Sequence, residues 1–399
     1  MRAAFVISAL AFIVPALGAP TIVPITKRAG PVKPGSYIVT FKSPESKDAG
    51  LGKLGDKLNG PDSSLTYDYG SLFPGIAVLL DLKDLALVRA MPEVEAIEED
   101  SILSLFDYVP GDASIDLAPH ITERHGSLAG RTGGSSNGAG VTVYGIDTGI
   151  YTEHECFGGR ATWGRTFGGY ADADGNGHGT HTAATAVCDT YGIATKAKVV
   201  AVKVMSDKGT GSTSDITAGI NYAFDEFKAN GGPAVATMSL GGPGGSNGPM
   251  NQAVQAAIAG GLHFTIAAGN SYMPADETSP ANTIEANTIG AVDTNKKKEK
   301  ADFSNYGQYI DAWAPGVNIK SAWIGNPKAE NTISGTSMAT PYVAGILASV
   351  LTNCPKLDPA TLSKQLVAHA PETVTFAPAD KVAELTSNHR FAQLWDCRA

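Results

Sequence analysis

The sequence predicts an α/β protein with a mostly parallel sheet flanked by helices, preceded by a small α+β domain. From about residue 117 to about residue 370, short apolar runs rich in β-branched residues alternate with helical segments. Such alternation is typical of a largely parallel sheet with helices on both faces. Residues 35–99 instead show short strand and helix patterns in the order β-α-β-β-α-β, which is the order of a ferredoxin-like unit.

The elements of the small domain follow from its hydrophobic pattern. Residues 35–42 alternate as a half-buried strand does, and a polar helical stretch follows to about residue 58. The remaining elements are two paired strands, a short amphipathic helix and a final strand, at residues 65–69, 76–80, 83–89 and 94–99.

The large domain is expected to contain five buried strands with helices between them. Continuous apolar runs indicate strands covered on both faces, at residues 141–146, 199–204, 235–240, 262–266 and 288–292. Helices are predicted at residues 182–187, 214–227, 250–259 and 338–351. Polar residues that follow the strands would gather at the carboxyl edge of the sheet, where open α/β sheets build their sites.

The first 18 residues predict a secretory signal. Met1 and Arg2 precede an apolar run at residues 3–17, and the small residues Ala16 and Gly18 occupy suitable cleavage positions. We therefore expect an exported, extracellular protein, and we expect no other segment to cross a membrane.

The charge balance excludes some partners. The 399 residues carry a formal net charge of −9, which argues against nucleic acid or an anionic membrane as the main partner. The basic run at residues 296–300 is expected to be a solvated loop.

Ser337 is a candidate nucleophile. It stands directly before the apolar run 338–351, in the segment GTSMATP at residues 335–341. The N–H groups at a helix start have no partner within the helix and would stabilise an oxyanion that forms beside this hydroxyl. A hydroxyl in this place still requires a base.

Two upstream residues can supply the base and the group that orients it. Asp147 follows the strand predicted at 141–146, and His178 stands where a glycine-rich loop becomes a helix. His178 would take the proton from Ser337, while Asp147 would fix the imidazole tautomer and stabilise the imidazolium.

These motifs resemble those of subtilisin-type serine proteases, and more closely the secreted proteinase K branch. The matching segments are DTG at 147–149, HGTH at 178–181, AAGN at 267–270 and GTSMATP at 335–341. The resemblance implies a subtilisin-like fold and broad-specificity endopeptidase activity through an acyl-enzyme intermediate, with no cofactor in the chemistry. It also implies that the Asn270 side chain and the N–H of Ser337 form the oxyanion hole, and that His181 is structural.

Other kinds of site fit these residues less well. Aspartic proteases need a second DTG or DSG motif, which the chain lacks. His178 and His181 could hold zinc, but no Glu or Cys completes a site at familiar spacing. An α/β-hydrolase esterase would need Gly where Ala339 stands. A catalytically silent homologue that binds peptides or proteins in the same cleft is the alternative function.

The small domain resembles the inhibitory propeptide of the same family. Residues 101–106 are expected to lie in the substrate cleft as a product, with self-cleavage near residues 105–110. The chain would then divide into a signal at 1–18, a propeptide at 19–108 and a peptidase domain at 109–399. Its partners would be protein or peptide substrates and its own propeptide as an intramolecular inhibitor, and we expect a monomer.

The family resemblance places two segments beside an extended substrate. They are Gly209, Thr210 and Gly211 on one side, and Ser239, Leu240, Gly241 and Gly242 on the other. Glycines there allow close approach of the substrate backbone. Residues 239–242 and 267–270, which include Ala268 and Gly269, would wall a small uncharged pocket that favours an apolar or aromatic residue before the scissile bond.

Four residues depart from the family pattern. Ala184 replaces a customary Gly, Thr182 a Cys, and Tyr342 a His, while Thr213 stands where the branch usually has a tyrosine lid. We expect these changes to tune the enzyme, because the positions of the catalytic residues are all retained.

Four cysteines in an exported protein predict two disulfides with three possible connectivities. Cys156 and Cys188 bracket the loop that carries His178, which favours pairing these two and pairing Cys354 with Cys397. Free buried thiols are the alternative.

The proteinase K resemblance also implies a structural calcium ion. The matching ligands are the carboxylate of Asp311 and the main-chain carbonyls of Ile284 and Ala286. Oxygen ligands suit a hard cation. The branch has proline in place of Ile284, and an exposed loop aspartate is the alternative for Asp311.

Overall fold

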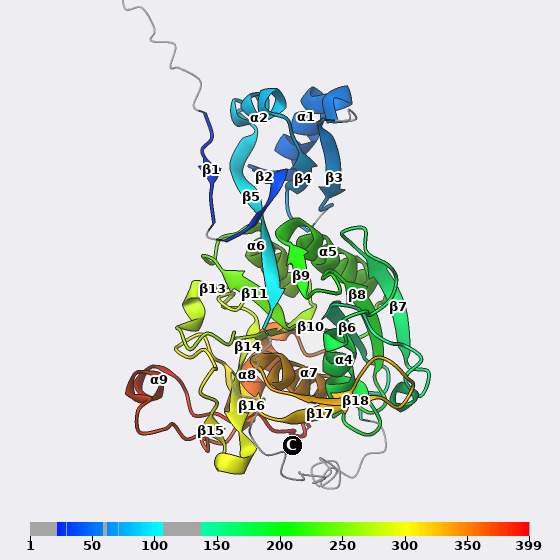
Figure 1. Cartoon of the computed structure of the whole chain (residues 1–399), viewed down its shortest axis with the longest axis vertical. Helices are drawn as coiled ribbons and strands as arrows, with labels where there is room; N and C mark the ends of the chain where they lie inside the picture. The colour runs from blue at the N-terminus through cyan, green and yellow to red at the C-terminus, as the bar shows by residue number, and fades with distance from the viewer. Residues whose placement is uncertain (1–21, 29, 59–61, 71, 107–136, 399) are drawn as a thin grey trace, which may run out of the picture.

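The computed structural model describes residues 22–28, 30–58, 62–70, 72–106 and 137–398. The predicted signal at 1–18 and the predicted domain boundary at residue 108 lie outside these residues. Figure 1 shows the small N-terminal domain above the large domain, with strand β5 running from one into the other.

The small domain has the β-α-β-β-α-β order predicted for it. Its main elements are β2 (Val32–Phe41), α1 (Pro44–Leu54), β3 (Ser64–Asp68), β4 (Gly75–Leu79), α2 (Leu82–Arg89) and β5 (Val94–Leu105). The strands lie in the antiparallel order β5-β2-β4-β3. Each helix begins at a side-chain cap, because Ser43 accepts a hydrogen bond from the Ser46 N–H and Asp81 accepts one from the Asp84 N–H.

The large domain is built on a mostly parallel sheet. Its strands are β6 (Thr142–Asp147), β7 (Ala161–Thr166), β8 (Lys198–Lys203), β10 (Ala234–Met238), β12 (His263–Ala267), β14 (Asn287–Asp293), β15 (Glu299–Lys300) and β16 (Ala312–Pro315). The order along the sheet is β15-β14-β12-β10-β6-β8-β7, with β16 also paired to β14. The predicted α/β class is confirmed, and only the β14–β15 pair is antiparallel among the described strand pairs of this sheet.

One predicted strand was wrong in its extent. The apolar run 235–240 does not form a single strand, because β10 ends at Met238 and a separate strand, β11 (Leu240–Pro243), leaves the sheet. Ser239 lies between them, so the chain turns from the core toward the other domain at this residue.

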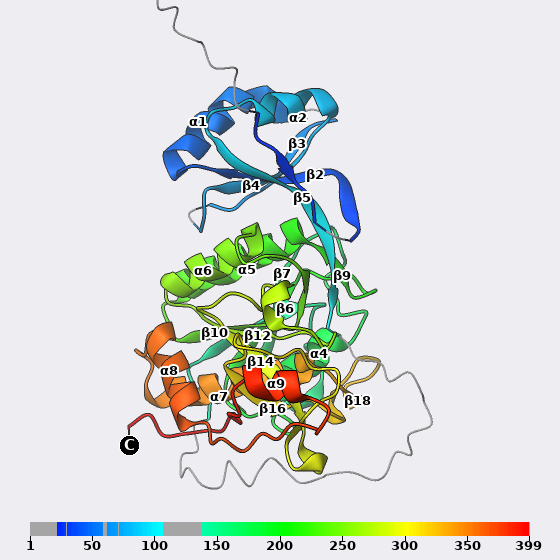
Figure 2. The ribbon, with the colours of Figure 1, turned by 90° about the vertical axis from the view of Figure 1, so that its left-hand side faces the viewer.

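Helices cover both faces of the large sheet. They are α4 (His178–Val187), α5 (Thr213–Asn230), α6 (Pro249–Ala259), α7 (Thr336–Asn353), α8 (Pro359–His369) and α9 (Lys381–Thr386). Figure 2 shows α5 and α6 between the sheet and the small domain, with α7 and α8 on the opposite side. Among the described helices, none is long and apolar enough to span a bilayer.

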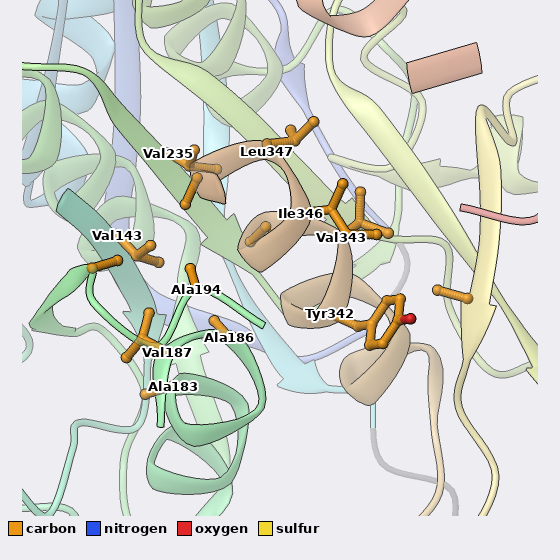
Figure 3. Close-up of a cluster of buried hydrophobic side chains, with 14 of the residues drawn as sticks. Val143, Ala183, Ala186, Val187, Ala194, Val235, Tyr342, Val343, Ile346 and Leu347 are labelled. Carbon is orange, nitrogen blue, oxygen red and sulfur yellow. The ribbon is translucent and has the colours of Figure 1, made fainter. Parts of the chain in front are cut away.

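The buried helix α7 is the centre of the larger core. Figure 3 shows Val343 and Leu347 of α7 together with Val143 and Val235 from the sheet and Val187 from α4. Every residue of helix α7 from Thr336 to Leu351 is buried, so the helix is surrounded by protein on all sides. Tyr342 joins this core, and burial raises its pKa to about 12.

The close packing of α4 on α7 depends on Gly345. A Cβ atom at this position would lie 2.7 Å from the carbonyl oxygen of Ala186 and 2.8 Å from the Cβ atom of Ile193. The two helices can therefore approach so closely only because residue 345 has no side chain. Their N-terminal residues, which include His178 and Ser337, are fixed relative to one another by this contact.

Two disulfides close the large domain. Cys156 is joined to Cys188, the residue that caps the C-terminal end of α4, and Cys354 at the end of α7 is joined to Cys397. These are the pairs that the sequence favours, and all four thiols are used.

Acid is expected to destabilise the fold through two buried histidines. Burial lowers the pKa of His263 to about 4 and that of His181 to about 3, from an ordinary value near 6.5. Below pH 6.5 both histidines are protonated in the unfolded chain but stay neutral in the folded chain. The free energy of unfolding therefore falls as the pH drops from 6.5 toward 4. For His263 the loss is about 3 kcal/mol.

Denaturant unfolding of the Ser337→Ala chain at pH 7 and at pH 4.5 measures this loss. The His263→Gln variant should lose visibly less stability over the same range, because the amide cannot gain a charge. An equal loss in both proteins would contradict the assignment.

Candidate active site

Asp147, His178 and Ser337 stand at the ends of three elements that pack together. Asp147 is the last residue of β6, His178 the first of α4 and Ser337 the second of α7. The helices α4 and α7 begin earlier than the apolar pattern predicts, since α4 starts four residues and α7 two residues sooner. All three side chains are buried.

Asp147 and His178 form a direct pair. The His178 Nδ1 atom lies 2.7 Å from the Asp147 Oδ1 atom. The carboxylate also accepts a hydrogen bond from the Thr148 N–H at 2.7 Å and one from the Thr182 hydroxyl at 3.3 Å. The aspartate is thereby held by three donors, and it in turn fixes the orientation of the imidazole ring.

Ser337 faces a main-chain carbonyl of the small domain. Its Oγ atom donates a hydrogen bond to the carbonyl oxygen of Phe106 at 2.7 Å. The Asn270 Nδ2 atom donates to the same oxygen. The Asn270 Oδ1 atom accepts hydrogen bonds from the N–H and the hydroxyl of Thr336, at 2.9 and 2.8 Å, which fixes the direction of the amide.

The segment before Phe106 lies in a cleft of the large domain as an extended strand. The second half of β5 is antiparallel to β9 (Thr210–Ser212) on one side and to β11 on the other. The Leu105 N–H donates to the carbonyl of Gly209 at 3.0 Å, and the Phe106 N–H donates to that of Ser239 at 3.4 Å. The residues predicted to hold a substrate backbone lie along this strand: Gly209, Thr210, Gly211, Ser239, Leu240, Gly241 and Gly242.

The comparisons with known proteins agree with this geometry. The subtilase family model matches residues 138–393, and the peptidase inhibitor I9 model matches residues 36–106. The chain is a member of the subtilase family. Its small domain is the inhibitory propeptide of a subtilisin-like serine endopeptidase made as a zymogen.

Individual relatives support the assignment over most of the chain. It is 40% identical over 324 residues to subtilisin-like protease 2 of Pseudogymnoascus destructans, covering 79% of this chain and 80% of that protein. It is 37% identical over 366 residues to the cuticle-degrading protease of Metarhizium anisopliae, covering 91% and 92%. A solved cold adapted subtilisin-like serine proteinase superposes with a TM-score of 0.60 at 40% identity, covering 66% of this subtilase and 92% of that chain.

Glycines shape the pockets of the subtilase cleft. A Cβ atom at Gly241 would lie 2.6 Å from the Phe106 ring, and one at Gly269 would lie 3.7 Å from it. The ring therefore lies against Gly241 and Gly269, two of the residues predicted to wall the pocket, and the neighbouring Ala268 is fully buried. A Cβ atom at Gly209 would lie 2.9 Å from Leu105.

A small cavity lies beside Leu103, which forms part of its lining. Its lining includes Thr213, Pro243 and Met250 from the peptidase domain. The Thr213 hydroxyl donates to the carbonyl of Ser101 at 3.2 Å, so this side chain binds the main chain of the segment in the cleft.

Asp174 is a site residue that the sequence analysis missed. Its Oδ1 atom accepts hydrogen bonds from the Thr148 hydroxyl and from the N–H groups of Asn176 and Gly177, at 2.9, 3.1 and 2.9 Å. Its Oδ2 atom accepts from the N–H and the hydroxyl of Thr180, at 3.0 and 2.6 Å. One buried carboxylate therefore ties the DTG segment to the start of α4. An aspartate a few residues before a helix start was the available signal, because such residues favour capping.

Replacing Asp174 with asparagine is expected to lower kcat by roughly 10- to 100-fold with little change in KM, because an amide offers one acceptor and turns N–H groups toward donors. Displacement of the Asp147–His178 pair should also change the pH profile of kcat/KM. A purely structural defect would leave that profile unchanged. Asp172→Asn, an exposed change in the same loop, is the matched control. If Asp174→Asn had wild-type kinetics, the hydrogen bonds of Asp174 to the DTG segment and to the start of α4 would not be needed for catalysis.

The three predicted calcium ligands differ in their exposure to solvent. Ile284 is largely exposed, Asp311 is half-buried and Ala286 is buried. The Asp311 Oδ2 atom accepts one hydrogen bond, from the Thr288 N–H at 2.8 Å, and burial raises the pKa of this carboxyl to about 7. The protein supplies only this one hydrogen bond to offset the loss of solvation of the carboxylate. A nearby cation would stabilise its charged form. No group of three or more His, Cys, Asp or Glu side chains suited to a metal occurs in the described part of the chain. A calcium ion at Asp311 would therefore need main-chain carbonyls as its other ligands, and the resemblance implies those of Ile284 and Ala286.

His181 has a structural environment. It is fully buried, and its Nε2 atom lies 3.0 Å from the carbonyl oxygen of Ile319. The ring contacts Trp323 edge to face at a centroid distance of 6.1 Å. These contacts join α4 to the hairpin of β17 (Ile319–Ala322) and β18 (Glu330–Ile333).

Proposed function

We propose that Ser337 is the nucleophile of this subtilase, His178 its general base, Asp147 the residue that orients the base, and Asn270 the oxyanion donor. The observation that carries the proposal is the carbonyl of Phe106, which accepts hydrogen bonds from both Ser337 Oγ and Asn270 Nδ2. A scissile carbonyl must occupy such a position, beside the attacking hydroxyl and within reach of a donor that stabilises developing negative charge.

The reaction follows from these positions. Ser337 Oγ adds to the carbonyl carbon, its proton passes to the imidazole of His178, and Asp147 stabilises the imidazolium. The negative oxygen of the tetrahedral intermediate is held by Asn270 and by the amides at the start of α7. The carbon–nitrogen bond then breaks, the imidazolium gives its proton to the leaving amine, and water hydrolyses the acyl-enzyme by the same route.

The first peptide bond cut would be the bond after Phe106, between residues 106 and 107. This position is two residues before the boundary expected from the sequence. A product segment with its last carbonyl against Ser337 is the arrangement left by self-cleavage at that bond. Amino-terminal sequencing of the mature enzyme tests this proposal and should give Asp107 as the first residue. A mature chain with a different first residue would show that the bond after Phe106 is not the one that is cut.

The cleft supports an endopeptidase with broad specificity and a preference for an apolar or aromatic residue before the scissile bond. The Phe106 ring lies against the main chain of Gly241 and Gly269, which leaves room for a large flat side chain. We further propose that the enzyme is secreted, monomeric and directed at proteins or peptides. Cleavage of a random peptide library would measure the preference directly.

We also propose a structural calcium ion at Asp311, with the carbonyls of Ile284 and Ala286 as further ligands. The ion would stabilise the loop and take no part in the chemistry. Removal of calcium with a chelator is expected to lower the Tm by several degrees, because an ion that binds only the folded state stabilises it. Asp311→Asn should make the Tm insensitive to calcium, and an equal calcium effect in both proteins would contradict the site.

A further inference from the structure

A short arm precedes the propeptide segment that matches the inhibitor family. That segment spans residues 36–106, whereas the described arm comprises residues 22–28. Strand β1 (Ile25–Thr26) pairs in parallel with β5. The N–H of Val23 donates to the carbonyl of Arg89 at 2.8 Å, and the Arg89 Nε atom donates back to the carbonyl of Val23 at 2.9 Å. The arm is therefore part of the folded propeptide.

The arm carries Arg28, whose direction is fixed by an ion pair. The Nε and Nη2 atoms of Arg28 lie 2.9 and 2.8 Å from the Oε2 atom of Glu98. The two side chains are only 15% and 11% exposed. Because little water screens the pair, it holds the guanidinium more firmly than an exposed surface pair would.

The same guanidinium lies directly on the main chain of the peptidase domain. A Cβ atom at Gly248 would lie 1.9 Å from Arg28 Nη2, and one at Gly244 would lie 2.2 Å from Arg28 Nη1. Gly248 has a φ of −73°, which any residue adopts, so the turn does not require glycine there. The missing side chain instead leaves room for Arg28.

Arg28 also lines the small cavity beside Leu103. Met250 and Ser279 of the peptidase domain line the same cavity. Figure 1 shows β1 beside β5, with its lower end directed toward α6 and β11. The arm therefore contacts the peptidase at Gly244 and Gly248, which border the cleft but lie outside the β5–β9 and β5–β11 strand pairs.

We propose that residues 244–248 form a docking surface for the arm, with Arg28 as its anchor, and that this contact retains the propeptide after the bond following Phe106 is cut. The inference rests on the proposed self-cleavage and inhibition. Dissociation of the cut propeptide then requires the cleft strand and the arm to separate, and removal of a largely buried charged contact acts mainly on the dissociation rate.

A double-mutant cycle on the full-length chain tests the contact. The variants are Arg28→Ala, Gly248→Ala and the two combined, and the readout is the lag between self-cleavage and the appearance of peptidase activity. Self-cleavage is followed separately on gels, so a chain that is never cut reports on the proposed function and not on the arm. Lys53→Ala is the matched control, because it breaks an ion pair with Glu93 formed inside the propeptide.

We expect Arg28→Ala to shorten the lag roughly tenfold and Lys53→Ala to leave it unchanged. Gly248→Ala should also shorten the lag, because its methyl group displaces the guanidinium. In the combined variant the lag should match that of Arg28→Ala alone, since the methyl group then has nothing to displace. Single variants with the wild-type lag, or effects that multiply in the combined variant, would overturn the proposal.

Discussion

Replacement of Ser337 with alanine is expected to leave the precursor uncut and to lower the hydrolysis of peptide substrates by about 10⁶-fold, the scale measured for subtilisin when its nucleophile is removed. The Oγ atom of Ser337 contacts the Phe106 carbonyl in the structure, and alanine has no atom that could attack this carbon. Gel electrophoresis and intact mass measure the processing, and a serine-directed phosphonate measures the availability of the nucleophile.

Ser349→Ala is the matched control for this experiment. Ser349 lies on the same helix, and its hydroxyl donates to the carbonyl of Gly345 within that helix. This variant should be cut, active and labelled by the phosphonate. A mature-sized product from purified Ser337→Ala would show that another protease makes the cut, and residual labelling would show that the nucleophile lies elsewhere.

Loss of the Asn270 amide is expected to have the second largest effect. Asn270→Leu keeps the approximate volume but removes the Nδ2 donor to the Phe106 carbonyl. We expect kcat to fall by about 100- to 1,000-fold, the loss known for the equivalent donor in subtilisin. KM should change little, because the donor acts on charge that develops in the transition state.

The Asn270 experiment needs a check on the fold, since the same side chain accepts two hydrogen bonds from Thr336. Denaturant unfolding of the variant and labelling of Ser337 would show whether the start of α7 is intact. Asn353→Leu, at the exposed end of the same helix, is the control. Normal turnover in a well-folded Asn270→Leu enzyme would remove Asn270 from the oxyanion hole.

The core strands could be predicted from the sequence because burial on both faces leaves a strong signal. β6, β8, β12 and β14 all begin and end within a residue of the predicted positions. The starts of α4 and α7 were placed too late, since His178 and Ser337 are polar and do not extend an apolar pattern. Hydrophobic periodicity locates the buried body of a helix, whereas a catalytic residue stands at its polar end.

The contacts between distant segments could not be predicted in this way. Asp174 and Thr148 are 26 residues apart, and nothing in either local pattern indicates that their side chains meet. Strand β5 continues to Leu105 because its second half is paired by another domain. The resemblance to a known family supplied the role of residues 101–106, which periodicity alone would have left as a mostly apolar continuation of the strand before it.

The continuity of β5 has a kinetic consequence. One strand belongs both to the sheet of the propeptide and to the three-stranded arrangement in the cleft, so the proposed cut after Phe106 would leave every backbone hydrogen bond before it in place. Each newly cut molecule would consequently be blocked by its own product. The first molecules to lose that product can digest the propeptides of the others, so a population of precursors should activate with a sigmoidal time course whose steepness grows with protein concentration.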